Sequence, residues 1–142
     1  MEKGKMIRKL LIPVILIAIV CSGVLASGCV ETRLFQDVSP QEAFNLIEDN
    51  KDSADFIILD VRRASEYQEG HLKNSINLDY YASDFAVELD KLDKGKSYLV
   101  YCHSGNRSSG ATKMMEELGF EKIYNMLGGI SAWQDEGFPV IK

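Results

Sequence analysis

The sequence predicts an α/β domain built on a parallel sheet of about five strands with helices on both faces. Two observations predict this class. Short apolar runs rich in strand-favouring residues, such as Phe56 to Val61 and Ser97 to Tyr101, are typical of strands buried in a parallel sheet. They alternate along the chain with segments whose apolar residues recur at three- and four-residue intervals, which is typical of helices. The chain has 142 residues, a size that allows one such domain.

The first half of the predicted domain begins at an edge strand, Phe35 to Val38. Ser39 and Pro40 suit the N-cap and first position of a helix, which is expected to end near Asn50. The other expected elements of this half are a buried strand at Phe56 to Val61, a helical turn at Ser65 to Gln68 and a short strand at Ile76 to Leu78.

The second half is predicted to contain two more strands and three helical segments. Tyr80 to Leu92 is expected to be a helix that turns four apolar side chains inward. These four are Tyr81, Phe85, Leu89 and Leu92. The elements that follow are a strand at Ser97 to Tyr101, a helix from Ser108 to the stop signal at Gly119, a strand at Lys122 to Met126 and a last turn at Ser131 to Glu136.

Residues 1–28 have the layout of a signal peptide or membrane anchor. Basic residues outweigh Glu2 at the start, and the apolar stretch Leu10 to Val20 and the small residues of Leu25 to Cys29 follow. The ending in Cys29 resembles the lipobox of prokaryotic lipoproteins, in which the cysteine receives a diacylglyceryl group. An uncleaved anchor is the alternative, because Leu10 to Ala26 is only slightly shorter than the ~20 apolar residues that span a bilayer.

Either form of attachment predicts the same location. Residues 29–34 would be a short linker, and residues 35–142 would be a domain held close to the membrane surface. We therefore expect the domain at the outer face of the cytoplasmic membrane or in the periplasm, tethered by lipid on Cys29 or by the uncleaved segment.

Composition excludes several classes of function. The formal net charge is −5, and the predicted signal segment carries more basic than acidic residues, so the rest of the chain is still more acidic. Nucleic acid is an unsuitable partner for such a domain. No cluster of histidines, cysteines or carboxylates has the spacing of a metal site, and no cofactor is expected.

A cysteine stands where a predicted strand gives way to a helix. Cys102 directly follows Ser97 to Tyr101, and the helix expected from Ser108 begins a few residues later. The first amides of such a helix have no partners, and they point into the loop at the carboxyl end of the strand. Those amides and the charge of Arg107 favour an anion, so we expect a lowered pKa for the Cys102 thiol.

The residues around this cysteine separate two interpretations. Taken alone, Cys102 would be better interpreted as a small buried hydrophobe. However, Gly105 allows a tight turn with its amide directed inward, and Asn106 tolerates left-handed conformations. Strand end, glycine, arginine and helix start together make Cys102 a candidate nucleophile.

Three segments carry motifs of one family. Cys102 to Ser108 reads CHSGNRS and resembles C-x-x-G-x-R-S, the active-site loop of rhodanese-like domains, whose cysteine carries sulfur as a persulfide. Ile58 to Leu78 resembles the D-V-R, E-Y, G-H-I and I-N signatures of the family, and Asn125 to Val140 resembles its closing G-G-x-x-x-W and G-x-P-V. The similarity spans Phe35 to Lys142, and it implies the parallel α/β architecture that the pattern of the elements also predicts.

The resemblance implies a set of site residues. Cys102 would be catalytic, and the loop after it would bind substrate through His103, Ser104, Gly105, Asn106, Arg107 and Ser108. Asp60 and Arg62 end a strand at the same edge of the sheet and would lie near the loop, although Arg62 could equally pair with Glu66 to hold the turn. His103 stands where the family often has arginine. We expect it to line the mouth of the site and not to form a Cys-His dyad, because adjacent side chains on a tight loop usually diverge.

The function implied by the resemblance is sulfur transfer. Cys102 would take a sulfane sulfur from thiosulfate or a persulfide and pass it to cyanide, a thiol or a protein cysteine. Cys102 has no resolving partner in its domain, so the acceptor would be external. The alternative is a membrane-tethered sulfur carrier or binding module without turnover, because neither His103 nor Ser104 supplies the extra basic residue expected of a good thiosulfate binder. A phosphatase or arsenate reductase fits less well, because those relatives have one residue more in the loop.

Overall fold

The computed structural model describes residues 34–142, which form a five-stranded parallel sheet with helices on both faces. The strand order is β1-β5-β4-β2-β3, and every neighbouring pair is parallel. The strands are β1 (Leu34–Val38), β2 (Phe56–Asp60), β3 (Ser75–Asn77), β4 (Ser97–Tyr101) and β5 (Lys122–Met126). The predicted fold class is therefore confirmed.

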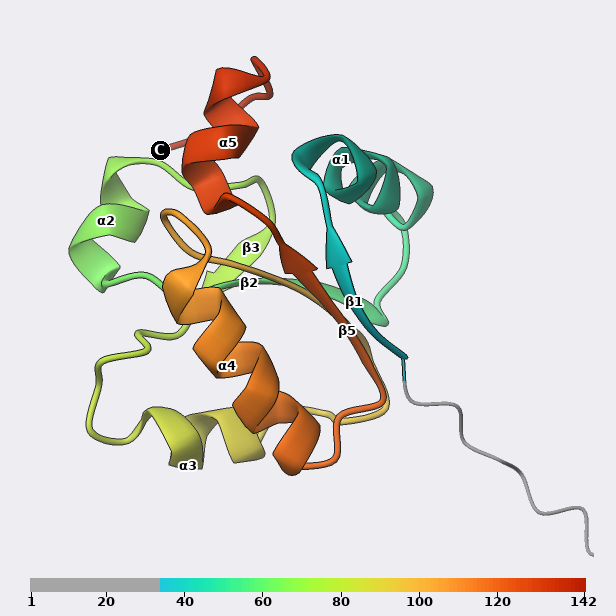
Figure 1. Cartoon of the computed structure of the whole chain (residues 1–142), viewed down its shortest axis with the longest axis vertical. Helices are drawn as coiled ribbons and strands as arrows, with labels where there is room; N and C mark the ends of the chain where they lie inside the picture. The colour runs from blue at the N-terminus through green and yellow to red at the C-terminus, as the bar shows by residue number, and fades with distance from the viewer. Residues whose placement is uncertain (1–33) are drawn as a thin grey trace, which may run out of the picture.

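Five helices connect and cover these strands. They are α1 (Pro40–Asp49), α2 (Ala64–Glu69), α3 (Phe85–Asp90), α4 (Asn106–Glu117) and α5 (Gly129–Asp135). Figure 1 shows α3 and α4 together on one side of the sheet and α1 and α5 together on the other. The helix α2 lies at the end of the sheet, beside the loop that leads into α4.

The sheet separates two hydrophobic cores. Under α3 and α4, side chains of the central strands such as Val100 pack on Phe85, Leu89 and Met115. On the opposite face, Leu99 and Tyr101 pack with Trp133 of α5 and with α1. Because β4 is central and buried on both faces, its carboxyl end is a rigid place from which to present the next residue, Cys102.

Local signals explain why α1 begins where the sequence predicts. Ser39 is the N-cap, and its hydroxyl oxygen accepts a hydrogen bond from the Glu42 amide at 3.3 Å. The Glu42 carboxylate in turn accepts from the Ser39 amide at 2.8 Å, which completes a capping box. Pro40 occupies the first turn, where its missing N–H costs nothing.

The predicted helix from Tyr80 to Leu92 is wrong in its first part. The helix α3 begins only at Phe85, because the chain before it is tied elsewhere: the Tyr80 amide donates to the Val61 carbonyl at 3.3 Å, and the Tyr81 amide donates to the Asp79 carboxylate at 2.9 Å. Phe85 and Leu89 face inward as expected. Tyr81 does not, since 61% of it is exposed.

Other boundaries differ from the prediction by one or two residues. Leu34, assigned to the linker, is already part of β1. The helix α4 starts at Asn106 and not at Ser108, so Asn106 is helical and does not take the left-handed conformation that we expected it to accommodate. Gly105 takes that conformation instead, at φ +102°.

The predicted signal peptide or anchor, its lipidation residue Cys29 and residues 30–33 lie outside the described part of the chain. Within residues 34–142, no helix has both the length and the apolar character needed to cross a lipid bilayer.

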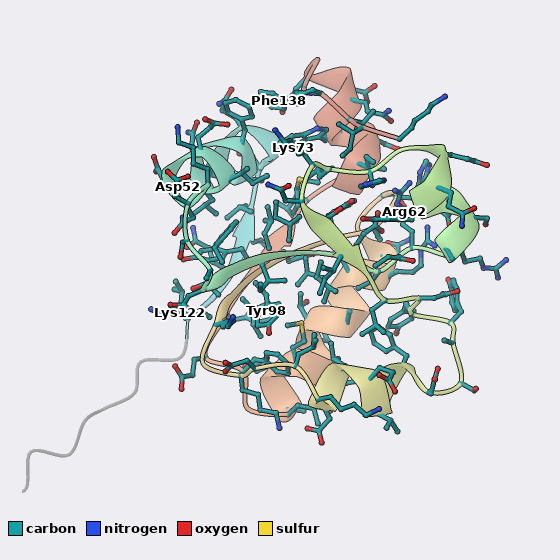
Figure 2. The ribbon with its side chains drawn as sticks, turned by 180° about the vertical axis from the view of Figure 1, so that it is seen from behind. Asp52, Arg62, Lys73, Tyr98, Lys122 and Phe138 are labelled. Atoms are coloured by element: carbon teal, nitrogen blue, oxygen red, sulfur yellow. The ribbon has the colours of Figure 1, made fainter. Side chains whose placement is uncertain are left out.

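In Figure 2, Lys122 and Tyr98 mark the amino ends of β5 and β4, whereas Arg62 lies at the carboxyl end of β2, close to α2.

Candidate active site

The candidate site is built around Cys102, the first residue after β4. Only 1% of it is exposed, and its sulfur lies inside the turn that leads into α4. The Gly105 amide points at this sulfur and donates to it at 3.1 Å. That direction requires the left-handed backbone of Gly105, a conformation that costs other residues roughly 1–2 kcal/mol.

The hydrogen bonds around the sulfur determine its ionisation. Burial raises the pKa of the Cys102 thiol, but hydrogen bonds from the Ser108 amide, the Ser108 hydroxyl and the Gly105 and Ser104 amides lower it. The donors prevail, so the pKa lies below the ordinary value for cysteine. The site therefore favours the thiolate, which is the nucleophilic form.

The helix α5 holds the Cys102 loop from behind. Its Ile130 amide donates to the Cys102 carbonyl at 2.8 Å, and its Ser131 amide donates to the His103 carbonyl at 3.1 Å. This approach depends on Gly129 at φ +59°, where an added Cβ would collide with both carbonyl oxygens. The close approach of α5 therefore engages both carbonyls, while the Gly105 amide donates to the sulfur.

Beside the sulfur lies an open cavity of about 500 Å³. It is lined by Arg63, Ser65, Glu66, Tyr81, Cys102, Ser104, Asn106 and Arg107. The Tyr81 ring has the Arg63 guanidinium 5.3 Å and the Arg107 guanidinium 5.8 Å from its centroid. Two guanidinium groups and one aromatic ring therefore form part of the wall of the cavity that Cys102 faces.

The guanidinium of Arg107 is fixed by Glu66 of α2. Its two terminal nitrogens donate to the two carboxylate oxygens at 2.6 and 2.8 Å. Hydrogen bonding to Arg107 lowers the pKa of Glu66 to about 2, and the same pair raises the pKa of Arg107. This pair attaches α2 to the first turn of α4 across the cavity.

Arg62 does not form the ion pair with Glu66 that the sequence suggested. It binds the buried carboxylate of Asp60 instead, with nitrogen–oxygen distances of 2.7 to 3.0 Å, and it donates to the Gly70 carbonyl at 2.6 Å. Asp60 is fully buried. Neither Asp60 nor Arg62 lines the cavity beside Cys102. Their contacts connect the end of β2 to Gly70, the residue after α2.

The structure separates the predicted site residues into four groups. Cys102, Ser104, Asn106 and Arg107 line the cavity, whereas Gly105 and Ser108 act as donors around the sulfur. His103 lines a neighbouring hollow of about 320 Å³ that Arg62 also borders. The His103 Nε2 lies 3.3 Å from the Ser131 hydroxyl and not against Cys102, in agreement with the argument against a dyad. Asp60 is fully buried and lines neither hollow.

Sequence reasoning did not assign four residues of the cavity to the site: Arg63, Ser65, Glu66 and Tyr81. Ser65 and Glu66 were expected only in the helical turn, which is α2. Arg63 follows Arg62 directly, and neighbouring residues that leave a strand end often point in opposite directions. If the Arg62 side chain points into the protein, this alternation directs the Arg63 side chain toward solvent. Tyr81 was expected to face inward because its spacing to Phe85 fits a helix, and only the turn at Asp79 shows otherwise.

The described residues offer no candidate metal centre, because residues 34–142 contain no group of three or more histidine, cysteine, aspartate or glutamate side chains placed to hold an ion.

Comparison with known proteins assigns the class. Residues 39–136 match the family model of the rhodanese-like domain. The chain is 31% identical over 101 residues to the thiosulfate sulfurtransferase GlpE of Coxiella burnetii, which covers 71% of this chain and 89% of that protein. It is 27% identical over 90 residues to a sulfurtransferase of Allochromatium vinosum, covering 63% of this chain and 82% of the relative.

Solved structures agree with these relatives. A rhodanese-related protein from Thermoplasma volcanium superposes with a TM-score of 0.63 at 31% identity, covering 75% of this chain and 98% of that one. A rhodanese-like domain protein from Staphylococcus aureus gives a TM-score of 0.62 at 25% identity, with 76% and 100% covered. The protein therefore belongs to the rhodanese-like domain family, and its sequence relatives include sulfurtransferases.

Proposed function

We propose that the protein is a sulfurtransferase in which Cys102 carries a sulfane sulfur as a persulfide between an external donor and an external acceptor. One observation carries this proposal: the buried Cys102 sulfur is surrounded by amide and hydroxyl donors that lower its pKa, and it faces an open cavity. The match to a thiosulfate sulfurtransferase supports it.

The chemistry needs only the groups on the loop. The Cys102 thiolate attacks the outer sulfur of thiosulfate or of a persulfide, and the sulfur–sulfur bond of the donor breaks as the new one forms. Sulfite or a thiolate leaves with the bonding electrons, so no outside oxidant is required. The same loop donors that stabilise the thiolate would stabilise the terminal sulfur of the persulfide.

The acceptor completes the cycle from the same side. Cyanide or a thiol would attack the terminal sulfur and release Cys102 as thiolate. Cys102 is the only cysteine in residues 34–142, so no resolving thiol is available within the domain. Because the sulfur faces one cavity, we expect donor and acceptor to use the same entrance in turn.

Steady-state kinetics of the full-length protein test this scheme. Initial rates of thiocyanate formation are measured while donor and cyanide are both varied, with Cys102→Ser as the inactive control. A ping-pong enzyme gives parallel lines in a double-reciprocal plot. Intersecting lines, or turnover that survives Cys102→Ser, would contradict the proposal. Formation of the persulfide without turnover would favour the carrier alternative.

We also propose that the domain is tethered outside the cytoplasmic membrane through lipid on Cys29 or through an uncleaved N-terminal segment. The charged, apolar and small-residue order of residues 1–29 supports this proposal. Detergent phase partitioning of protein from the native host would test it, alongside Cys29→Ala. If Cys29 carries a lipid, the wild type should enter the detergent phase and Cys29→Ala should not. If the N-terminal segment is an uncleaved anchor, both proteins should enter the detergent phase. Partitioning of the wild type into the aqueous phase would refute the tether.

A further inference from the structure

The cavity beside Cys102 is much larger than the chemistry alone requires. Its volume of about 500 Å³ lies within the range of roughly 300–1,000 Å³ typical of sites for small organic ligands. An inorganic donor with a few non-hydrogen atoms would occupy only the part next to the sulfur. The rest of the cavity is lined by α2 and by the turn that holds Tyr81.

The two guanidinium groups of the cavity are not equivalent. Arg107 donates hydrogen bonds to both carboxylate oxygens of Glu66. The negative charge of Glu66 therefore offsets the attraction of Arg107 for an anionic ligand. Arg63 has no carboxylate within 4.0 Å among residues 34–142, and its side chain is exposed over the Tyr81 ring. Arg63 is therefore the cation of the cavity that is available to an incoming anion.

The balance of charge disfavours a small dianion. With Cys102 as thiolate, the charges of Arg63, Arg107, Glu66 and Cys102 sum to zero, and the negative sulfur lies where the donor must react. A ligand that reacts at one end and carries its negative charge at the other avoids repulsion by the thiolate. It can pair that charge with Arg63 and pack its body on the exposed Tyr81 ring.

We infer that the preferred donor is an organic persulfide bearing a carboxylate, whose charged end binds Arg63 while its body packs on Tyr81. The inference rests on the proposed sulfur transfer. In the step, the Cys102 thiolate attacks the terminal sulfur of R–S–SH, the sulfur–sulfur bond of the donor breaks, R–S⁻ leaves, and the proton stays on the new Cys102 persulfide. The donor is reduced to a thiol as the sulfane sulfur moves, so electrons and atoms balance.

The test compares three donors with the full-length protein: glutathione persulfide, the neutral persulfide of 2-mercaptoethanol, and thiosulfate. Arg63→Gln should lower kcat/KM for glutathione persulfide roughly tenfold, the size expected from loss of a hydrogen bond to a charged group. For the neutral persulfide and for thiosulfate the change should be less than about twofold, as for an exposed charge that the donor does not touch. Tyr81→Leu should act on both organic persulfides.

The matched control is Lys113→Gln, which removes one exposed positive charge on α4 away from the cavity and should leave all three donors unchanged. Equal losses for every donor in Arg63→Gln, or none for glutathione persulfide, would overturn the inference. A wild type that transfers sulfur from thiosulfate but not from glutathione persulfide would overturn it while leaving the proposed function intact. A wild type that transfers from none of the donors would refute the proposed function itself.

Discussion

Substitution of Ser108 by alanine tests how the loop activates its cysteine. The Ser108 hydroxyl is fully buried and lowers the pKa of Cys102. Its single proton has two possible acceptors, the Cys102 sulfur and the Gly105 carbonyl oxygen 3.1 Å away. Ser108→Ala removes this hydroxyl and keeps the backbone amide that also donates to the sulfur. The thiolate loses one donor, so its pKa must rise.

The size of the effect follows from the energy of such a bond. A hydrogen bond to a charged group contributes about 1.5–3 kcal/mol. Since one pKa unit corresponds to about 1.4 kcal/mol, we expect the pKa of Cys102 to rise by about one to two units. Below both pKa values the thiolate fraction, and with it the rate of alkylation, should fall about tenfold per unit.

The assay is the rate of alkylation of the full-length protein by iodoacetamide as a function of pH. The wild-type inflection should lie below the ordinary pKa of cysteine, and the Ser108→Ala inflection should lie above that of the wild type. Ser109→Ala is the matched control, because it removes a hydroxyl from the next position of α4 that does not contribute to the Cys102 pKa. An unchanged or lower inflection in Ser108→Ala would refute this account of the activation.

Three further substitutions test other contacts by urea unfolding. Glu66→Gln should cost about 1 kcal/mol at pH 7. The folded-state pKa of Glu66 is depressed from 4.5 to about 2. The stabilisation by the Glu66–Arg107 pair is therefore present above pH 4.5 and lost as the pH falls toward 2. An equal cost of Glu66→Gln at pH 3 and pH 7 would contradict this account. Gly129→Ala should lower the free energy of unfolding by more than its control, Gly137→Ala, for which roughly 1–2 kcal/mol is expected. Both glycines have positive φ, but only at Gly129 would an added Cβ clash with the loop. Equal losses of stability in the two variants would argue against a tight contact between α5 and the loop. Tyr101→Phe should cost about 1–3 kcal/mol, since its hydroxyl accepts from the buried Leu72 amide, and should leave the alkylation profile unchanged.

The sequence predicted most of the fold because its signals are local. The buried runs at Ser97 to Tyr101 and Lys122 to Met126 coincide with β4 and β5. The Ser39 and Pro40 pair marked the start of α1. The first part of the Tyr80 to Leu92 helix failed because apolar spacing cannot show that the Tyr80 amide is taken by the Val61 carbonyl, a contact between distant parts of the chain.

The candidate site was predicted unevenly for the same reason. The turn around Cys102 is contiguous in sequence, and the inward amide of Gly105 could be anticipated from the residue types. The pairing of Glu66 with Arg107 joins residues 41 positions apart, so the nearer Arg62 was the expected partner. Arg63 was overlooked because its role depends on the cavity it lines and not on a motif.

The central claim is that Cys102 accepts a sulfane sulfur, and intact-mass spectrometry tests it most directly. The full-length protein is incubated with thiosulfate and, separately, with glutathione persulfide, with Cys102→Ser alongside. The account predicts a gain of one sulfur atom that disappears on addition of cyanide and is absent from the variant. A folded wild type that gains no sulfur from either donor, while Cys102 still reacts with iodoacetamide, would contradict the claim.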